Sequence, residues 1–377
     1  MRTAVIPLML LPGIALADVT LYGSVQGSLG RHAISQGASQ SRIDDTGSSF
    51  GAKGNELLGS GLKTIWQIEF DFGMDGTKEH LGLNETFVGI EDPSLGKLRI
   101  GNLNNALKDM TTLNQWKSGG QIKHAGAEAD KNYGADALTV FTNPAQFLKN
   151  AIRYDTPSFG GFSANLAYGF GENRNRDDGP SADRTSVGLR YQTSGWFAAY
   201  AYLREQNPCG TGVSDDQKKH CLPQTANVAA ANLHYVEGGY RDDHWLLALA
   251  LQQARGYDWS DQFSGASKSR YTVNGQQLAP AEAKLRTRQA ALSLAYTTGA
   301  FTPKLTLARG WDQQVNGAKL AQSGYRQWIA GVDYALSKRT TAGLAHGRLT
   351  FDQNANQALY GKTTQLTATS VNFTHKF

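Results

Sequence analysis

The sequence lacks the long apolar run that a membrane-spanning helix needs. No stretch of about eighteen apolar residues occurs, so the mature chain has no candidate for such a helix. Proline is scarce, with 10 in 377 residues. Most prolines lie in connections, as expected where a missing N–H would break a strand ladder. With 40% hydrophobic residues, the composition by itself is that of a soluble protein.

Patterns typical of enzymes and of nucleic-acid binding are also missing. The 8 histidines are scattered, and no His-Glu-x-x-His motif occurs. We therefore expect no enzyme activity, no metal and no cofactor. The formal charge of +5 falls to +4 if Arg2 is removed with a leader peptide. No Lys/Arg run is present, and this disfavours a nucleic-acid partner.

Cysteine is limited to Cys209 and Cys221, which lie in one polar connection. In an oxidising compartment these two residues can form a disulfide that closes a short loop. A metal site is disfavoured, because His220 is the only further soft ligand nearby. We expect a disulfide that staples a loop.

What the sequence does contain is a regular alternation, with apolar side chains at every second position. In 64–72, Trp66, Ile68 and Phe70 occupy one face, while Glu69 and Asp71 lie on the other. Alternation of this kind indicates β-strands. A strand with carboxylates on its second face cannot have both faces in a dry core. Because such strands are joined by alternately short and long connections, the pattern predicts a transmembrane β-barrel.

The first residues predict a cleaved signal peptide. A short basic start at Met1-Arg2 precedes an apolar region, and Ala15-Leu16-Ala17 has the small-x-small form of a cleavage site. We expect residues 1–17 to be removed, so that the mature barrel covers 18–377.

About sixteen strands are expected, a number that closes an antiparallel barrel with both termini on one side. They are placed at 18–31, 47–55, 60–73, 82–91, 96–102, 148–156, 160–171, 183–192, 195–206, 229–241, 243–256, 284–297, 301–312, 324–336, 339–352 and 362–377. The short connections, such as Asn55–Gly59, are read as periplasmic turns. The long ones, including 32–46 and 256–284, are read as extracellular loops.

One long connection differs from the others. The third, 103–147, is about 45 residues long and carries Trp116 and Phe141. Loops of this length are usually functional or disordered, and the apolar anchors argue against disorder. A barrel of sixteen strands encloses an aqueous channel. We therefore predict that this loop folds into the lumen and forms its constriction.

Several stretches, in order along the chain, resemble the trimeric general porins of Gram-negative outer membranes, and those of Neisseria and related β-proteobacteria most of all. They are Asp18-Val19-Thr20-Leu21-Tyr22-Gly23, 51–67 (GAKGNELLGSGLKTIWQ), Phe87-Val88-Gly89-Ile90, Gly96-Lys97-Leu98-Arg99-Ile100-Gly101, Ile152-Arg153-Tyr154-Asp155-Thr156-Pro157, Leu336-Ser337-Lys338-Arg339-Thr340 and His375-Lys376-Phe377.

This resemblance implies a sixteen-stranded barrel in outer-membrane lipid, a homotrimer, and passive diffusion of ions and small hydrophilic solutes. It also implies that the terminal Phe377 is part of the signal for membrane insertion. Two alternatives stay open. One is a substrate-specific channel of the same fold, and the other is a barrel with a filled lumen, which would show almost no conductance.

The sequence departs from the family pattern at four positions. Relatives usually carry cations where this chain has Ser49 and Asn84, and often an arginine at the position of Asn102. An acidic residue that commonly follows the loop tryptophan is here Lys117. Because these relatives place a basic wall opposite an acidic loop, we expect a weakened transverse field.

Strand parity names the charges that could line the constriction. If Leu98 and Ile100 face lipid, the neighbouring Lys97 and Arg99 face the lumen. The wall candidates are Lys53, Lys97, Arg99, Arg153 and Asp155, and the loop candidates are Asp109, Lys117, Glu128, Asp130 and Asp136. Rings of such charges set ion preference in pores.

Overall fold

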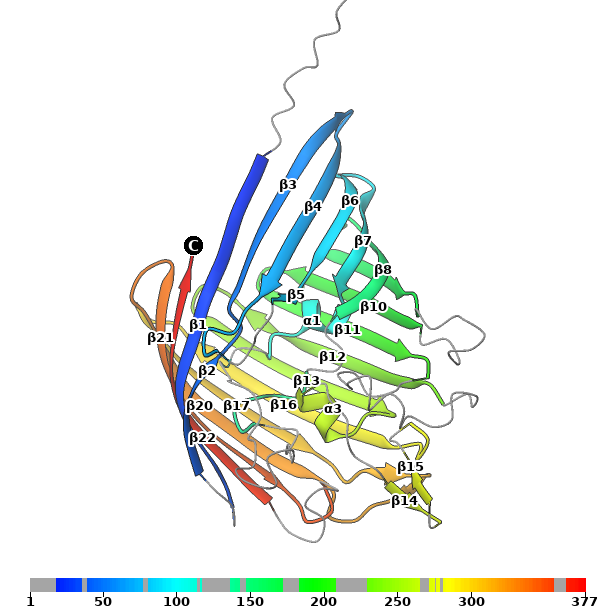
Figure 1. The fold of residues 1–377 in the computed structure, drawn as a ribbon, viewed down its shortest axis with the longest axis vertical. Helices are drawn as coiled ribbons and strands as arrows, with labels where there is room; N and C mark the ends of the chain where they lie inside the picture. Colours follow the sequence, from blue (N-terminus) through cyan, green and yellow to red (C-terminus); the bar gives the residue numbers. More distant parts are fainter. Residues whose placement is uncertain are drawn as a thin grey trace, which may run out of the picture.

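The chain forms a closed antiparallel β-barrel (Figure 1). The computed structural model describes residues 18–35, 39–76, 81–113, 116, 136–142, 147–171, 183–207, 229–264, 271–274, 276–278, 281–355 and 364–377. Sixteen strands make the wall: β1 (Asp18–Ile34), β3 (Ser49–Gly59), β4 (Leu62–Asp71), β6 (Thr86–Asp92), β7 (Gly96–Asn104), β8 (Phe147–Asp155), β9 (Phe162–Gly169), β10 (Arg184–Thr193), β11 (Trp196–Glu205), β12 (Ala231–Arg241), β13 (Trp245–Arg255), β16 (Arg286–Tyr296), β17 (Phe301–Gly310), β20 (Tyr325–Ala335), β21 (Thr340–Phe351) and β22 (Thr364–Lys376).

The wall closes because the last strand pairs with the first. The register of β22 on β1 runs from Ser24 opposite Lys376 to Ile34 opposite Leu366. Figure 1 shows the blue β1 beside the red C-terminal strand. Closure removes the free edges that a sheet cannot expose to lipid.

Shorter elements complete the fold. Strand β2 (Ser39–Asp45) continues the line of β3 along β1, and β5 (Gly82–Leu83) continues β6 along β4. The hairpins β14 (Tyr271–Val273) with β15 (Gln276–Leu278) and β18 (Gln314–Val315) with β19 (Ala318–Lys319) lie in connections. The short helices are α1 (Ala106–Met110) and α3 (Trp259–Ser264).

Within the described ranges, no helix has both the length and the apolar character needed to cross a bilayer.

The period of two in the sequence becomes an outer and an inner face of the wall. On β22, Val371 and Phe373 are 56% and 52% exposed, whereas Ser370 and Asn372, which alternate with them, are 2% and 5% exposed. Apolar side chains on one face and polar ones on the other are what a strand between lipid and a lumen requires.

The described residues of the long segment 103–147 contact the inner face. The N–H of Ala106 donates to Ser186 Oγ at 2.7 Å, and Trp116 Nε1 donates to Thr306 Oγ1 at 2.9 Å. Further along, Gln327 Nε2 donates to the carbonyl of Ala137 at 3.0 Å. These contacts attach the segment to β10, β17 and β20, and they bury an apolar cluster between the segment and the wall.

Two sequence-based boundaries are wrong. The turn expected over Asn55–Gly59 lies later, because β3 continues to Gly59 and the chain reverses at Ser60 and Gly61, where φ is 52° and 88°. The connection at 32–46, expected as a loop, is largely strand, since β1 extends to Ile34 and β2 pairs with it.

The connection after β13 also differs from the expected external loop. Its helix α3 turns Trp259 and Phe263 onto Tyr325, with ring centroids 4.9 Å and 5.2 Å apart. Its Gln262 side chain is fully buried and accepts a hydrogen bond from Gln252 Nε2 at 2.9 Å. Because these wall residues lie on the inner face, α3 packs against the inside of the barrel.

Candidate functional site

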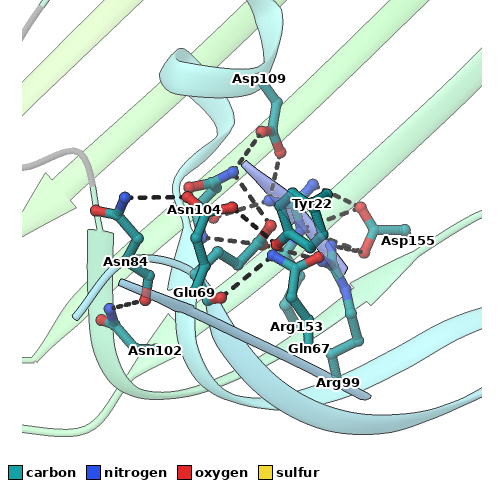
Figure 2. Close-up of polar contacts among 11 residues, drawn as sticks. Tyr22, Gln67, Glu69, Asn84, Arg99, Asn102, Asn104, Asp109, Arg153 and Asp155 are labelled. Carbon is teal, nitrogen blue, oxygen red and sulfur yellow. Dashed lines mark hydrogen bonds and ion pairs between the residues drawn. The ribbon is translucent and has the colours of Figure 1, made fainter. Parts of the chain in front are cut away.

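Two arginines on neighbouring strands form the centre of a charged cluster on the inner wall (Figure 2). Arg99 on β7 and Arg153 on β8 lie directly opposite each other in register. Asp155 separates their charges, accepting from Arg99 at 2.7 Å and from Arg153 at 2.6 Å. The arginine side chains are only 12% and 4% exposed. Burial of like charges side by side is tolerable only with such shared carboxylates.

The long segment contributes a carboxylate to this cluster. Asp109 of α1 pairs with Arg153 at 2.6 Å. Asn104, at the start of the segment, accepts from Arg153 through its carbonyl at 2.8 Å and donates through its amide to Glu85 at 3.3 Å. The wall arginine Arg153 is therefore attached to the segment at two points.

Helix α1 is held at both of its ends. The side chain of Asn105 accepts from the N–H of Lys108 and caps the helix start. At the other end, Arg190 of β10 donates to the carbonyls of Asp109 and Met110 at 2.9 Å and 3.3 Å. These last carbonyls carry the negative end of the helix dipole, so a cation there is stabilising.

Lys108 of α1 points to Phe147, with Nζ 3.6 Å from the ring centroid. Burial lowers the pKa of Lys108, while Glu69 and Glu85 oppose that shift. A cation–π contact of this kind retains a buried ammonium group.

A second carboxylate, Glu69 on β4, is held by neutral donors. Tyr22 donates to it at 2.8 Å and Asn84 at 3.0 Å. Within the described part of the chain, no cation lies at ion-pair distance from Glu69. Lys53 lies over the Tyr22 ring, at 5.2 Å from its centroid. Asn84, where relatives usually carry a cation, therefore leaves a negative charge on this part of the wall.

The other two departures on the wall occupy different surroundings. Ser49 lies opposite Asp71 in the β3–β4 register. The amide of Asn102 donates to the carbonyls of Leu83 and Asn84 at 3.3 Å and 2.7 Å and is buried. Asn102 thus stabilises the backbone where β5 passes into β6.

The structure brings together four sequence candidates, Arg99, Asp109, Arg153 and Asp155, with Lys53 nearby. Lys97 pairs with Glu91 at 2.9 Å instead. Asp136 is buried, and its carboxylate lies 3.5 Å from Nδ1 of His32, a residue of β1. The candidates outside the described residues are Lys117, Glu128, Asp130, Cys209 and Cys221.

Sequence reasoning missed Tyr22, Glu85 and Asn104. Glu85 falls at the break between β5 and β6, and Asn104 follows a register shift between Gly101 and Leu103, so alternation cannot place either side chain. Tyr22 does have the inward parity, since Leu21 beside it is 75% exposed. Its position next to the outward apolar Leu21 was the available signal.

The terminal Phe377 is half-exposed and fixed to β1. Its N–H donates to the carbonyl of Gly23 at 3.1 Å, and its carbonyl accepts from the N–H of Gly23 at 3.3 Å. A Cβ at Gly23 would lie 2.5 Å from the Phe377 ring, so the glycine makes room for it.

Comparison with known proteins decides the family. A family model described as Gram-negative porin matches residues 3–354. The chain belongs to this family. A curated relative of this porin, the major outer membrane protein P.IB of Neisseria lactamica, is 32% identical over 377 residues, 97% of this chain and 96% of the relative.

Two solved structures show the same fold. The anion-selective porin of Comamonas acidovorans aligns with a TM-score of 0.65 at 19% identity, covering 96% of this chain and 100% of that one. OmpT of Vibrio cholerae in its trimer form aligns with a TM-score of 0.61 at 13% identity, covering 96% and 99%.

The porin is a channel of the Gram-negative outer membrane for passive diffusion and has no enzymatic role. A barrel of this width with a polar inner face provides the water-filled path such diffusion requires. The described inner wall adds fixed charges of both signs to that path.

Proposed function

We propose that the segment 103–147 folds into the lumen and that the cluster around Arg99 and Arg153 lines the narrowest part of the channel. The ion pair between Asp109 and Arg153 carries this proposal, because it joins the segment to the wall across the inner face. The contacts of Trp116 and Ala137 with β17 and β20 support it from the other side of the segment.

We propose that this porin discriminates only weakly between anions and cations. Arg99 and Arg153 are neutralised by Glu85, Asp109 and Asp155. Among the described residues, Glu69 accepts side-chain hydrogen bonds from neutral donors only. With mixed charges paired at short range, little net field extends into the water-filled path, since an ion pair attracts neither sign strongly.

The test restores the cations that relatives carry. The double variant Ser49→Arg and Asn84→Arg should shift the reversal potential, measured in a planar bilayer across a KCl gradient, toward anion preference. An added cation raises the local anion concentration over about a Debye length, roughly 8 Å at physiological salt and roughly 3 Å at 1 M. The shift should therefore shrink in molar salt. An unchanged reversal potential in dilute salt would show that the cluster does not line the narrowest point.

We also propose that the porin is a homotrimer, that residues 1–17 are a cleaved signal peptide and that Cys209 and Cys221 form a disulfide. The trimer is supported by the structural neighbour OmpT, which is described in trimer form. The small residues of 341–345 give the trimer little further support. Gly343 and Ala345 point inward, and only Ala342 and Leu344 face outward.

A further inference from the structure

Arginine side chains gather on the outer face of the wall, where lipid rather than solute is the neighbour. Arg288 on β16, Arg309 on β17 and Arg326 on β20 are exposed. They share the outward parity of Leu307, which is 45% exposed, while the alternate residues Gln289, Ala308 and Gln327 are buried. These strands are neighbours in the wall (Figure 1).

The cluster lies at the end of the barrel that carries the long connections. Arg309 is followed within two residues by the connection 311–324, and Arg326 lies just after that connection. In barrels of this class the long connections are extracellular. The arginines are therefore at the level where the apolar band ends and the headgroups of the outer leaflet begin.

The register places like charges face to face. Arg309 lies directly opposite Arg326, and Arg255 on β13 lies directly opposite Arg286. Like charges at directly opposed positions destabilise a strand pair. Within the part of the chain that the structure describes, Arg286 and Arg309 have no carboxylate partner. An anion between the opposed arginines would remove this repulsion.

Four of these arginines line one hollow of about 780 Å³. It is lined by Arg286, Arg288, Arg309, Arg326 and Lys319, and by the aromatic ring of Trp311. Two carboxylates also line it, Asp312 paired with Lys319 at 3.2 Å and Asp352 near Arg326 at 3.7 Å. Cations therefore outnumber carboxylates, and the hollow has room for a headgroup.

We propose that this hollow binds the phosphate groups of a phosphorylated lipid of the outer leaflet. A planar guanidinium donates two parallel hydrogen bonds to a phosphate, and this makes arginine well suited to such groups. Basic pockets on membrane proteins next to an apolar surface bind anionic lipid headgroups in the same way. The acyl chains would continue along Leu307 and the outward apolar rows below it.

The test measures binding of bisphosphorylated lipid A to the full folded porin by native mass spectrometry from a non-ionic detergent. We expect the double variant Arg309→Gln and Arg326→Gln to bind about tenfold more weakly or worse, because it loses two charge-assisted contacts. The matched control is Arg31→Gln and Arg204→Gln, which removes two outward arginines away from the hollow and should bind like the parent. Dephosphorylated lipid A should bind the parent as weakly as the bisphosphorylated form binds the double variant.

Several results would overturn the proposal. Equal binding of phosphorylated and dephosphorylated lipid would mean that apolar contact alone explains the binding. An equal loss of binding in the control variant would mean that the overall positive charge of the porin, and not this hollow, attracts the lipid. Displacement of the lipid by inorganic phosphate at matched phosphate concentration would assign the hollow to a soluble anion. Loss of the trimer in the double variant, with lipid binding retained, would assign it to contact between copies.

A second variant guards against a folding defect. Arg309→Lys with Arg326→Lys keeps the charge and loses the paired donors, so it should bind between the parent and the glutamine variant. Single-channel conductance of all variants should stay at the parent value, because the altered side chains face away from the lumen. Lipid binding and channel conductance can thus change independently of each other.

Discussion

At the scale of residues, the inner wall depends on a few buried charges that compensate one another. Arg153 illustrates this, since it pairs with Asp109 and Asp155 and also donates to the carbonyl of Asn104. Removing Arg153 would leave Asp109 without its ion pair and Asp155 with Arg99 as its remaining partner. Breaking one side of a largely buried pair costs more than the pair contributes.

We expect Arg153→Gln to lower the free energy of unfolding by about 3 kcal/mol, the range for breaking a buried ion pair. It should also shift the reversal potential toward cations, because Asp109 loses its ion pair and Asp155 keeps only the one with Arg99. Urea unfolding in lipid vesicles and bilayer recordings measure the two effects. Lys97→Gln is the control, since its pair with Glu91 is half-exposed and should contribute less than about 1 kcal/mol. Equal effects of both substitutions would contradict the assigned roles.

We expect the turn between β12 and β13 to respond to pH through Asp242. Asp242 accepts the N–H of Trp245 at 2.6 Å and of His244 at 2.9 Å. These two hydrogen bonds lower the pKa of Asp242 below its ordinary value, and the one from Trp245 has the larger effect. A carboxylate with a lowered pKa stabilises the folded turn above its unfolded pKa, about 3.9, and loses that effect as pH falls through the folded pKa.

We therefore expect the hydrogen-exchange protection of the Trp245 amide, corrected for the intrinsic rate, to be constant from neutral pH down to about 4 and to fall below it. Asp242→Asn should make the protection independent of pH and lower it at neutral pH. The turn at Ser337 is the internal control, because there a hydroxyl accepts from the N–H groups of Arg339 and Thr340 and does not titrate. A parallel fall in both turns would indicate general acid unfolding instead.

At the scale of elements, docking to the wall determines where the connections lie. The segment 103–147 is anchored by Trp116, which is buried, donates to Thr306 and lies under Lys304, with Nζ 4.7 Å from the ring centroid. A Cβ at Gly331 would lie 3.0 Å from the same ring, so this glycine leaves room for it. Helix α3 is docked in a similar way through Trp259 and Phe263.

We expect Trp116→Ala to destabilise the porin by about 3 kcal/mol, as for other buried aromatic truncations. It should also broaden the distribution of single-channel conductance, because the segment loses an anchor. Trp196→Ala is the control, since Trp196 is 61% exposed on the outer face. A narrow, unchanged conductance distribution in Trp116→Ala would show that this anchor does not set the channel width.

At the scale of the whole molecule, stability comes from the closed ladder of sixteen strands. Each of the sixteen wall strands has a partner on both sides, and the β1–β22 pairing completes the ring. A cross-link in one connection restricts mainly the ends that it joins. Cys209 and Cys221 lie between β11 and β12, away from this ladder in sequence.

We expect the disulfide to be present in the secreted porin and unnecessary for barrel formation or for the trimer. Alkylation without reduction should find no free thiol in the parent. Cross-linking of the Cys209→Ser and Cys221→Ser double variant in mild detergent should still give trimers. Free thiols in the parent would refute the disulfide, and only monomer in the variant would refute its dispensability.

Much of the fold could be predicted from local pattern alone. Alternation identified the wall strands, the inward parity of Arg99 and Arg153 and the outward parity of Leu98 and Ile100. It could do so because successive side chains in a strand point to opposite faces wherever the strand lies. The number of strands follows from counting the alternating segments. The register of each strand follows from the same pattern, since a one-residue slip would turn its apolar side chains into the lumen.

The tertiary structure alone decided which of the charges meet. Glu85 and Asp109 reach the arginines, and Asp136 reaches His32, through contacts between positions far apart in the chain. Helix α3 lies against the inner wall because Trp259 and Phe263 find an aromatic partner in Tyr325. No local period encodes such contacts, because the position of a connection depends on the side chains it meets across the barrel. The sequence by itself therefore determined the wall, and long-range packing determined what lies inside it.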